Sequence, residues 1–373
     1  MTNNYDFAVV GGGLVGAAIG YGLAKRGIKV LMLDEGDVAK RASRGNFALV
    51  WVQSKGLGMP AYATWTRRSS DHWGAFAAEL EDLAGFSLAY RRPGGFHLCL
   101  SQDELDRRAS SINRLHNQAD TEPYRIDVLD GDEIRRHLPE VGPEVVGGTF
   151  CALDGDVNSL KLFRGLHAGF AASGGFYRSG ALVEHIETGA GGGYAIKTGE
   201  AVYHADRIVL AAGLDNLRLG KMIGLDVPVR PLRGQVIVTE KTEPFLDMPL
   251  STVRQTDEGG VMIGDSQEEA DDYKIMRPGI TAVMADRAIR MFPRLGRLNV
   301  VRTWSALRVY SPDGFPIYQQ SPTHPGAFAA SCHSGVTLAA AHADMLAPLM
   351  AQGALSSDLD AFSSRRFHVP ATA

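Results

Sequence analysis

The sequence predicts an α/β protein whose core is a parallel β-sheet, and three observations lead to this prediction. An apolar strand at residues 5–10, a helix at 14–25 and a strand at 29–33 form a βαβ unit at the start of the chain. A second strongly apolar strand, residues 205–212, stops at Gly213. Helices and strands alternate along the rest of the 373 residues, enough chain for roughly two or three domains.

The remaining elements follow from apolar spacing and from glycine. Apolar residues at helical spacing predict helices at 59–83, 103–117, 131–137, 159–172, 279–291 and 336–352. Short apolar or alternating runs predict strands at 91–100, 181–186, 194–198, 235–239, 261–264, 299–309 and 327–330. The glycines of 189–193 predict a hairpin turn, and Gly27 ends the first helix.

The composition excludes several classes of protein. Lys and Arg number 38 against 42 for Asp and Glu, so the net charge is −4 and no basic face for nucleic acid is expected. Cys99, Cys151 and Cys332 are too few for a disulfide scaffold and predict reduced thiols in a cytoplasmic protein. Residues 7–24 carry no charge, but their six glycines and strand-like start argue against a transmembrane segment.

The loop after the first strand carries a dinucleotide-binding fingerprint, because Gly11, Gly13 and Gly16 match the pattern GxGxxG. Gly11 permits a tight turn, Gly13 leaves room for a pyrophosphate at the backbone, and Gly16 lets the helix pack closely on the strand. The phosphates would lie at the positive N-terminus of the helix. Asp34 ends the next strand, where it can accept hydrogen bonds from ribose hydroxyls.

The second apolar strand supports the same site without identifying the dinucleotide. It ends in Ala211, Ala212 and Gly213, and such small residues let the backbone lie against a bound ring or phosphate. An ordinary core strand with a glycine turn would look the same. The fingerprint alone leaves FAD and NAD both open.

Five segments, in order along most of the chain, resemble the FAD-dependent D-amino acid oxidase superfamily, which includes glycine oxidase and sarcosine oxidase. They are VVGGGLVGAA at 9–18, LAAG at 210–213, VRPLRGQ at 229–235, TWSALRVYSPDGFPIY at 303–318 and SCHSGVTLAAAHA at 331–343. Within this superfamily, the chain is most similar to the flavin (beta) subunits of bacterial opine oxidases, which act on octopine and nopaline. The segment that carries this narrower resemblance is ASRGNFALVWVQ at 42–53. The flavin subunits of hydrogen cyanide synthase and of heteromeric proline dehydrogenase are also similar.

This resemblance implies a discontinuous, Rossmann-like FAD-binding domain formed by residues 1–90, 150–222 and 325–373. Residues 91–149 and 223–324 would form a mixed-sheet α+β substrate-binding domain. Together with the fingerprint, it implies contacts to FAD from Gly11, Gly13, Leu14, Val15, Gly16, Asp34, Glu35, Ser43, Arg44, Asn46, Val183, Ala211, Ala212, Gly213, Ser334, Gly335, Val336 and Thr337. The last four begin the helix at 336–352, whose N–H groups and dipole would stabilise anionic reduced flavin. Ser334 and Gly335 would equally serve as a helix cap.

The resemblance places two residues, Arg308 and His333, at the substrate. Arg308 matches the arginine that binds the substrate carboxylate in glycine oxidase-like enzymes, and a planar guanidinium suits that contact. A structural salt bridge is the alternative role for Arg308. His333 would face the flavin, where it either touches substrate or fixes the loop. Arg254, Tyr273 and Tyr310 lie in segments that could line the site.

The implied reaction is hydride transfer from a carbon next to an amine nitrogen to flavin N5, which gives an imine that hydrolyses. An opine is a secondary amine flanked by carboxylates, and its products are an amino acid and a 2-oxo acid. Three alternatives stay open. They are a self-contained glycine, sarcosine or D-amino acid oxidase that makes hydrogen peroxide, a 2-hydroxy acid dehydrogenase on the same fold, and a scaffold subunit that binds flavin only structurally.

The cofactor is expected to be non-covalent. Some sarcosine oxidases attach flavin through a cysteine, but the matching neighbourhood here is Trp304, Ser305 and Ala306. We expect no metal site. The chain lacks a ferredoxin-like run of cysteines, so FMN or an iron–sulfur cluster would be held on, or shared with, partner subunits of a heteromeric dehydrogenase.

Overall fold

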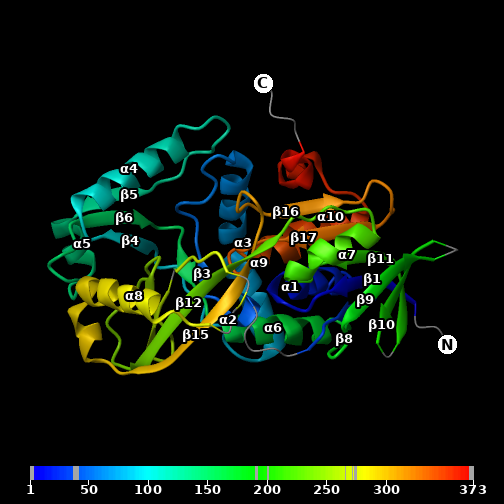
Figure 1. The fold of residues 1–373 in the computed structure, drawn as a ribbon, viewed down its shortest axis with the longest axis horizontal. Coiled ribbons are helices and arrows are strands. Elements are labelled where there is room, and N and C mark those ends of the chain that lie inside the picture. The colour runs from blue at the N-terminus through cyan, green and yellow to red at the C-terminus, as the bar shows by residue number, and fades with distance from the viewer. Residues whose placement is uncertain are drawn as a thin grey trace.

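The computed structural model describes residues 4–36, 42–189, 192–199, 201–264, 266–270, 272 and 275–368. Figure 1 shows a large sheet and its helices on the right, a smaller antiparallel sheet on the left, and the long helix α3 (Pro60–Ala84) near the middle. Residue Tyr273, one of the candidates for the site, lies outside the described residues.

The large sheet is mainly parallel, which confirms the predicted α/β class. Its strands in spatial order are β16 (Ile317–Gln320), β17 (Ala327–Ser331), β11 (Val202–Leu210), β1 (Asn4–Val10), β2 (Val30–Leu33) and β8 (Phe176–Arg178). The hairpin of β9 (Val183–Thr188) and β10 (Tyr194–Thr198) pairs with β11 through β10. β1 runs parallel to β2 and β11, and β11 runs parallel to β17. Three distant parts of the chain therefore meet at the centre of the sheet.

Helix α1 (Leu14–Ala24) explains the uncharged stretch near the start of the chain. Nearly all its residues are buried, because it contacts α6 (Ser159–Ala172) and the C-terminal helices as well as the sheet. A helix that is apolar all round belongs in a core or a membrane. Gly22 permits this packing, since a Cβ there would collide with the backbone of Ala343. No helix in the described part of the chain has the length and apolarity needed to cross a membrane.

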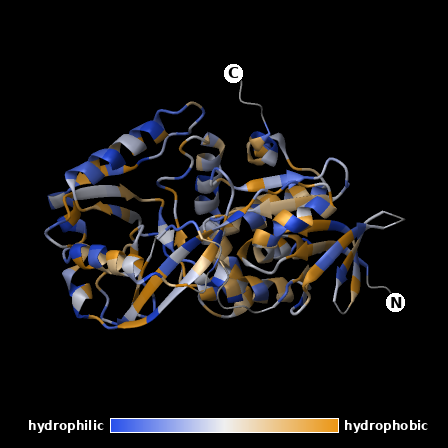
Figure 2. Cartoon of the chain, in the orientation of Figure 1, coloured by the Kyte–Doolittle hydropathy of each residue, from blue (hydrophilic) through white to orange (hydrophobic). Residues whose placement is uncertain are grey.

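The smaller part is built on antiparallel strands. The order of its main sheet is β13 (Val253–Gln255), β14 (Gly260–Ile263), β12 (Arg230–Lys241) and β15 (Val300–Tyr310), with α8 (Pro278–Met291) against it. A second sheet has the order β4 (Gly95–Cys99), β6 (Gly147–Cys151) and β5 (Asp127–Asp130). The strand β3 (Leu49–Val50) pairs with β7 (Gly155–Asp156). Helix α4 (Gln102–His116) is mostly hydrophilic in Figure 2, and its buried residues are Ile112 and Leu115.

The last predicted helix begins later than expected. Residues 335–338 form a turn, followed by α9 (Ala339–Ala341), a π-helical segment (His342–Leu346) and α10 (Ala347–Gln352). Buried contacts account for the change, because the Thr337 carbonyl accepts hydrogen bonds from Ser69 and Trp73, and His342 pairs with the Tyr318 hydroxyl at 2.7 Å. The other helices are α2 (Ala42–Gly45), α5 (Gly131–His137) and α7 (Asn216–Met222), with 3₁₀ turns at Gly213–Asp215, Pro293–Arg297, Ser357–Phe362 and Ser364–Phe367.

Candidate active site

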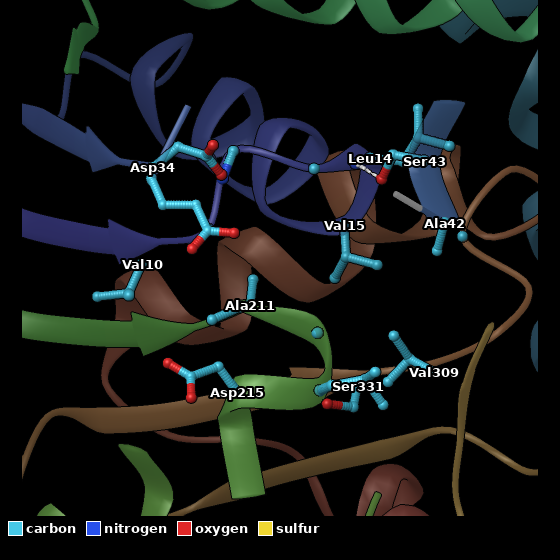
Figure 3. Close-up of a pocket in the computed structure, with 18 of the residues that line it drawn as sticks. Val10, Leu14, Val15, Asp34, Ala42, Ser43, Ala211, Asp215, Val309 and Ser331 are labelled. Atoms are coloured by element: carbon cyan, nitrogen blue, oxygen red, sulfur yellow. Dashed lines mark hydrogen bonds between the residues drawn. The ribbon is translucent and has the colours of Figure 1, made fainter. Parts of the chain in front are cut away.

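A cavity of about 760 Å³ opens where β1, β2 and β11 end. This is the edge at which ligands bind in open α/β sheets, because the loops that leave the carboxyl ends of the strands form a crevice. Figure 3 shows labelled residues of β1, α1, α2, β15 and β17 around the open space, together with Ala211 directly after β11. The predicted residues that line it are Gly11, Gly13, Leu14, Val15, Asp34, Glu35, Ser43, Arg44, Asn46, Val183, Ala211, Ala212, Gly213, His333, Gly335 and Val336.

Tight packing around the glycine-rich loop explains its residues. Gly11 has a φ of +104°, and a Cβ there would collide with the backbone of Ala211. A Cβ on Gly16 would collide with the Gly11 carbonyl, and Gly16 does not line the cavity. A Cβ on Gly13 would come within 2.7 Å of Ser43 Oγ. Gly11 and Gly16 therefore require glycine because a Cβ would meet backbone, while a Cβ on Gly13 would displace the Ser43 hydroxyl.

Asp34 and Ser43 hold this loop in place. The two carboxylate oxygens of Asp34 accept hydrogen bonds from the N–H groups of Gly12 at 2.7 Å and Gly36 at 2.9 Å. The hydroxyl of Ser43 accepts one from the Leu14 N–H at 2.9 Å, drawn in Figure 3. Each of these oxygens has lone pairs left, and the Ser43 hydroxyl keeps its own hydrogen to donate. Both residues can therefore bind a ligand and still support the loop.

Asn46, another residue predicted to contact the cofactor, has a side-chain oxygen without a hydrogen-bond partner among the described residues. Asn46 donates from Nδ2 to the Ser43 carbonyl at 2.7 Å, while its buried Oδ1 has no hydrogen-bond partner among the described residues. Buried acceptors are normally paired, so this oxygen marks a place where a ligand N–H group would fit.

One wall of the cavity was missed from the sequence. His167 contacts the Gly12 carbonyl through Nε2 at 2.8 Å, and its ring lies 4.6 Å from Phe163 and 4.8 Å from Tyr177. Arg44 lies 5.0 Å above the Phe163 ring. Phe163 and His167 are four residues apart on one face of the predicted helix 159–172, which is the only signal that could have grouped them.

Another wall of the cavity is the turn before α9. Cys332, His333, Gly335 and Val336 line the cavity. The first hydrogen bonds of the turn run from Leu338 N–H to Ser334 at 3.0 Å and from Ala339 to Val336 at 3.1 Å. The N–H groups of residues 335–337 precede these bonds, so they form the positive end of the turn.

Ser334 and Thr337 are not among the residues that line the cavity. The Ser334 hydroxyl accepts hydrogen bonds from the Tyr62 hydroxyl at 2.8 Å and from Lys55 Nζ at 3.1 Å. The Thr337 hydroxyl accepts from the Trp51 N–H and donates to the Leu49 carbonyl, both at 3.1 Å. These two residues anchor the turn to the chain segment 49–62.

Arg308 also lies outside the cavity lining. It is paired with Leu232 across β12 and β15, and Leu307 and Val309, its neighbours in β15, line the cavity. Successive side chains point to opposite faces of a strand, so Arg308 shares the other face with Tyr310. Its guanidinium lies over Gly234, where a Cβ would come within 2.8 Å of Nη2.

His333 connects the cavity to Arg308. Its imidazole stacks on the Tyr310 ring, with centroids 5.3 Å apart. The side chain is exposed to the open cavity but enclosed by surrounding protein, and this desolvation lowers the pKa of His333 well below its usual value. The positive charges of Lys55 and Arg308 lower it further. His333 is therefore neutral at physiological pH.

Arg254 does not line the cavity, whereas Cys332, for which the sequence predicted only a reduced thiol, does. Arg254 is buried, pairs with Asp156 at 3.3 Å and donates to the Phe47 carbonyl at 2.6 Å, so it holds structure beside the site. Cys332 lines the cavity, and burial raises the pKa of its thiol to about 12. A thiol of this kind stays protonated and is a poor nucleophile.

Known proteins match the chain over nearly its whole length. A family profile described as "FAD dependent oxidoreductase" matches residues 6–349. One of the subunits of opine oxidase from Agrobacterium tumefaciens (strain Ach5) is 47% identical over 97% of this chain and 98% of its own length, and the protein of the same name from Rhizobium meliloti is 45% identical over 97% of each. The crystal structure of glycine oxidase from Geobacillus kaustophilus superposes with a TM-score of 0.88 at 25% identity, covering 97% of this chain and 98% of that one. The glycine-bearing cavity at the ends of β1 and β11, together with these matches, shows that the chain belongs to the D-amino acid oxidase family of FAD-dependent oxidoreductases.

Proposed function

We propose that this chain is the FAD-bearing subunit of a dehydrogenase that oxidises an opine such as octopine or nopaline. The observation that carries the proposal is the 47% identity to the opine oxidase protein of Agrobacterium tumefaciens over 97% of this chain and 98% of the relative. Both chains are matched over nearly their whole lengths, which supports a shared activity as well as a shared nucleotide-binding fold. The substrate is then a secondary amine flanked by carboxylates.

The residues around the cavity fit FAD. Gly11 and Gly13 let a pyrophosphate approach the N-terminus of α1, while Asp34 keeps lone pairs for ribose hydroxyls. The buried Oδ1 of Asn46 accepts from an N–H group of the cofactor. Gly335 and Val336 bring the positive end of the turn before α9 to the site. Three residues outside the cavity lining support the residues that make these contacts, and they are Gly16, Ser334 and Thr337.

When bound, FAD supplies the acceptor for the hydride that leaves the carbon next to the amine nitrogen. Arg308 binds the carboxylate on that carbon and so orients its C–H bond. His333 is neutral, so it forms a hydrogen bond at the substrate without adding a further positive charge. Loss of the hydride and of the amine proton leaves an imine, and water splits it into an amino acid and a 2-oxo acid.

We infer that other subunits complete the enzyme, since two similar proteins are named as subunits. FMN or an iron–sulfur cluster would be held on or shared with those partners. We propose that residues 1–90, 150–222 and 325–373 bind FAD and that residues 91–149 and 223–324 bind the substrate. β16 is an exception to these ranges, because it is a strand of the large sheet and so belongs with the FAD-binding part. Cys99, Cys151 and Cys332 are free, which supports a cytoplasmic location.

A self-contained amine oxidase is the second candidate. The similarity to glycine oxidase at a TM-score of 0.88 supports it. Such an enzyme would pass electrons to oxygen and release hydrogen peroxide without a partner.

Anaerobic bleaching of the bound flavin tests these proposals. The purified chain is mixed with octopine, nopaline, proline, sarcosine or 2-hydroxyglutarate, and flavin absorbance is followed. We expect octopine or nopaline to bleach it fastest. Bleaching by sarcosine with peroxide release in air would favour the oxidase instead. Bleaching by 2-hydroxyglutarate and by none of the amines would contradict amine oxidation altogether, and no bleaching by any compound would indicate a scaffold role for the flavin.

A further inference from the structure

The segment that carries Lys55 is held in place by hydrogen bonds to a buried carboxylate. Asp154 is fully buried and accepts hydrogen bonds from the N–H groups of Val52 and Gln53 and from the side-chain amide of Gln53 at 2.7 Å. The Lys55 N–H then donates to the Val52 carbonyl at 3.1 Å, which closes a tight turn. Lys55 is thus presented by a rigid part of the chain.

Its ammonium group lies in a cluster of hydrogen-bond donors beside the cavity. Lys55 Nζ donates to Ser334 Oγ at 3.1 Å, and the buried Tyr62 hydroxyl donates to the same oxygen at 2.8 Å. A hydroxyl that accepts two hydrogen bonds has only its own hydrogen left to give. The ring nitrogens of His333 lie at a long 3.5 Å from this hydroxyl. The cluster therefore places the positive charge of Lys55 next to His333, which lines the cavity.

Two cations from different elements act on the same histidine. Lys55 reaches it through Ser334, and Arg308 reaches it from β15, whose Tyr310 stacks on the His333 ring. Both positive charges lower the pKa of His333. A substrate with a single carboxylate needs only one of these cations, whereas two together match an anion with two carboxylates.

We propose that Lys55 binds a second substrate carboxylate, while Arg308 binds the first, so that the site selects secondary amines with two carboxylates. This inference rests on the proposed opine-oxidising function and names the residue that distinguishes an opine from a one-carboxylate amine. Ser334 and Tyr62 position the lysine, because Lys55 Nζ and the Tyr62 hydroxyl both donate to the Ser334 hydroxyl.

The experiment compares octopine with the analogue in which the carboxylate of the arginine half is a carboxamide. Anaerobic stopped-flow bleaching gives the dissociation constant and the limiting rate of flavin reduction separately. We expect the wild-type chain to bind octopine about 10- to 100-fold more tightly than the carboxamide, as for loss of a charged hydrogen bond. Equal affinity of the wild-type chain for the two compounds would overturn the inference before any variant is made.

Variants then locate the effect. Lys55→Gln should weaken octopine binding by about the same 10- to 100-fold factor, leave carboxamide binding unchanged and preserve the limiting rate within about threefold. Lys55→Arg should keep most of the preference, because the positive charge remains. Lys197→Gln is the matched control, since this lysine pairs with Glu187 on the surface hairpin of β9 and β10. FAD content and melting temperature report folding.

The outcomes separate this inference from the function on which it rests. Octopine binding that is unchanged in Lys55→Gln, or weakened equally for both compounds, contradicts the role of Lys55 and leaves opine oxidation standing. Failure of the wild-type chain to bleach with both octopine and nopaline contradicts the proposed function, and the inference fails with it.

Discussion

The ring of Tyr310 stacks on the imidazole of His333, with centroids 5.3 Å apart and planes inclined by 30°. This contact joins β15, which carries Arg308, to the turn that forms one wall of the cavity. The Arg230 guanidinium also lies over the Tyr310 ring, 5.3 Å from its centroid, and so helps to hold the ring in place. The position of His333 therefore depends on a residue that does not line the cavity.

Replacing Tyr310 tests this dependence. Tyr310→Leu should raise the KM for the opine substrate about 2- to 10-fold, since an aromatic pair contributes about 0.5–1.5 kcal/mol. FAD content should not change. Tyr310→Phe keeps the ring and is the control, expected within about twofold of wild type. Steady-state kinetics with an artificial electron acceptor measure both, and an unchanged KM in Tyr310→Leu would show that the stack has no role in substrate binding.

Arg308 should not tolerate even a conservative change. Arg308→Lys keeps the charge but loses the planar pair of donors, so kcat/KM for the opine should fall by about 10- to 100-fold. Arg308→Met should fall further. If Arg308 served only as a structural ion pair, Arg308→Lys would retain the wild-type kcat/KM, and its loss would show mainly as a lower melting temperature.

A double variant tests whether the space beside Gly13 is needed for Ser43 or for a pyrophosphate. A Cβ at this position would meet Ser43 Oγ at 2.7 Å, but the Cβ of residue 43 only at 3.8 Å. Gly13→Ala should therefore lower both the melting temperature and the affinity for FAD. Adding Ser43→Ala removes the clash together with the hydrogen bond from the Leu14 N–H, so the melting temperature should recover to that of the Ser43→Ala single variant. FAD binding should not recover to that level if a pyrophosphate needs the same space. Recovery of FAD affinity in the double variant would show that glycine is needed at position 13 only to make room for the Ser43 hydroxyl.

Flavin should be released on denaturation. Cys332 is the cysteine beside the cavity among the described residues, and burial raises the pKa of its thiol to about 12, which disfavours the thiolate needed for attachment. Precipitation with trichloroacetic acid should leave the yellow colour in the supernatant. A yellow pellet would contradict non-covalent binding, and a protein with covalently bound flavin serves as the control.

Asp154 should make stability depend on pH. Burial raises the pKa of Asp154 to about 7. Because its pKa is higher in the folded than in the unfolded state, the folded state binds the extra proton between roughly pH 4 and 7. The free energy of unfolding should therefore fall as pH rises through this range, by up to about 1.4 kcal/mol per pH unit, and level off above 7. Denaturant titrations of wild type and Asp154→Asn test this, and parallel pH profiles would exclude it.

Local chemistry explains why part of the site was predictable from the sequence. Gly11, Gly13 and Asp34 follow two apolar strands, and parallel strands bring such loops to one edge. Ala211 and Gly213 end the strand next to them. These residues line the cavity because their position follows from elements that periodicity reveals.

The rest depends on contacts between distant segments. His167 and Tyr177 form a wall because α6 and β8 pack beside the loop at Gly12, which no local pattern indicates. The helix predicted from Val336 starts at Ala339, because its first turn is bound to a segment nearly three hundred residues earlier, as in the hydrogen bond of Thr337 to Leu49. Tertiary contacts of this kind override the helical spacing of the sequence.

The strand order of the large sheet also governs when the protein can be completed during its synthesis. β1 leaves the ribosome before the other strands of this sheet, but β17, which pairs with its neighbour β11, begins only at residue 327. At about 5–20 residues per second, translation of the intervening chain takes on the order of 15–60 s. During this time the apolar pair of β1 and α1 lacks its final covering and is open to association with other chains or with chaperones. The wall of the cavity formed by Ser331, Cys332 and His333 is therefore made last, and the FAD site is complete only after this late segment has left the ribosome.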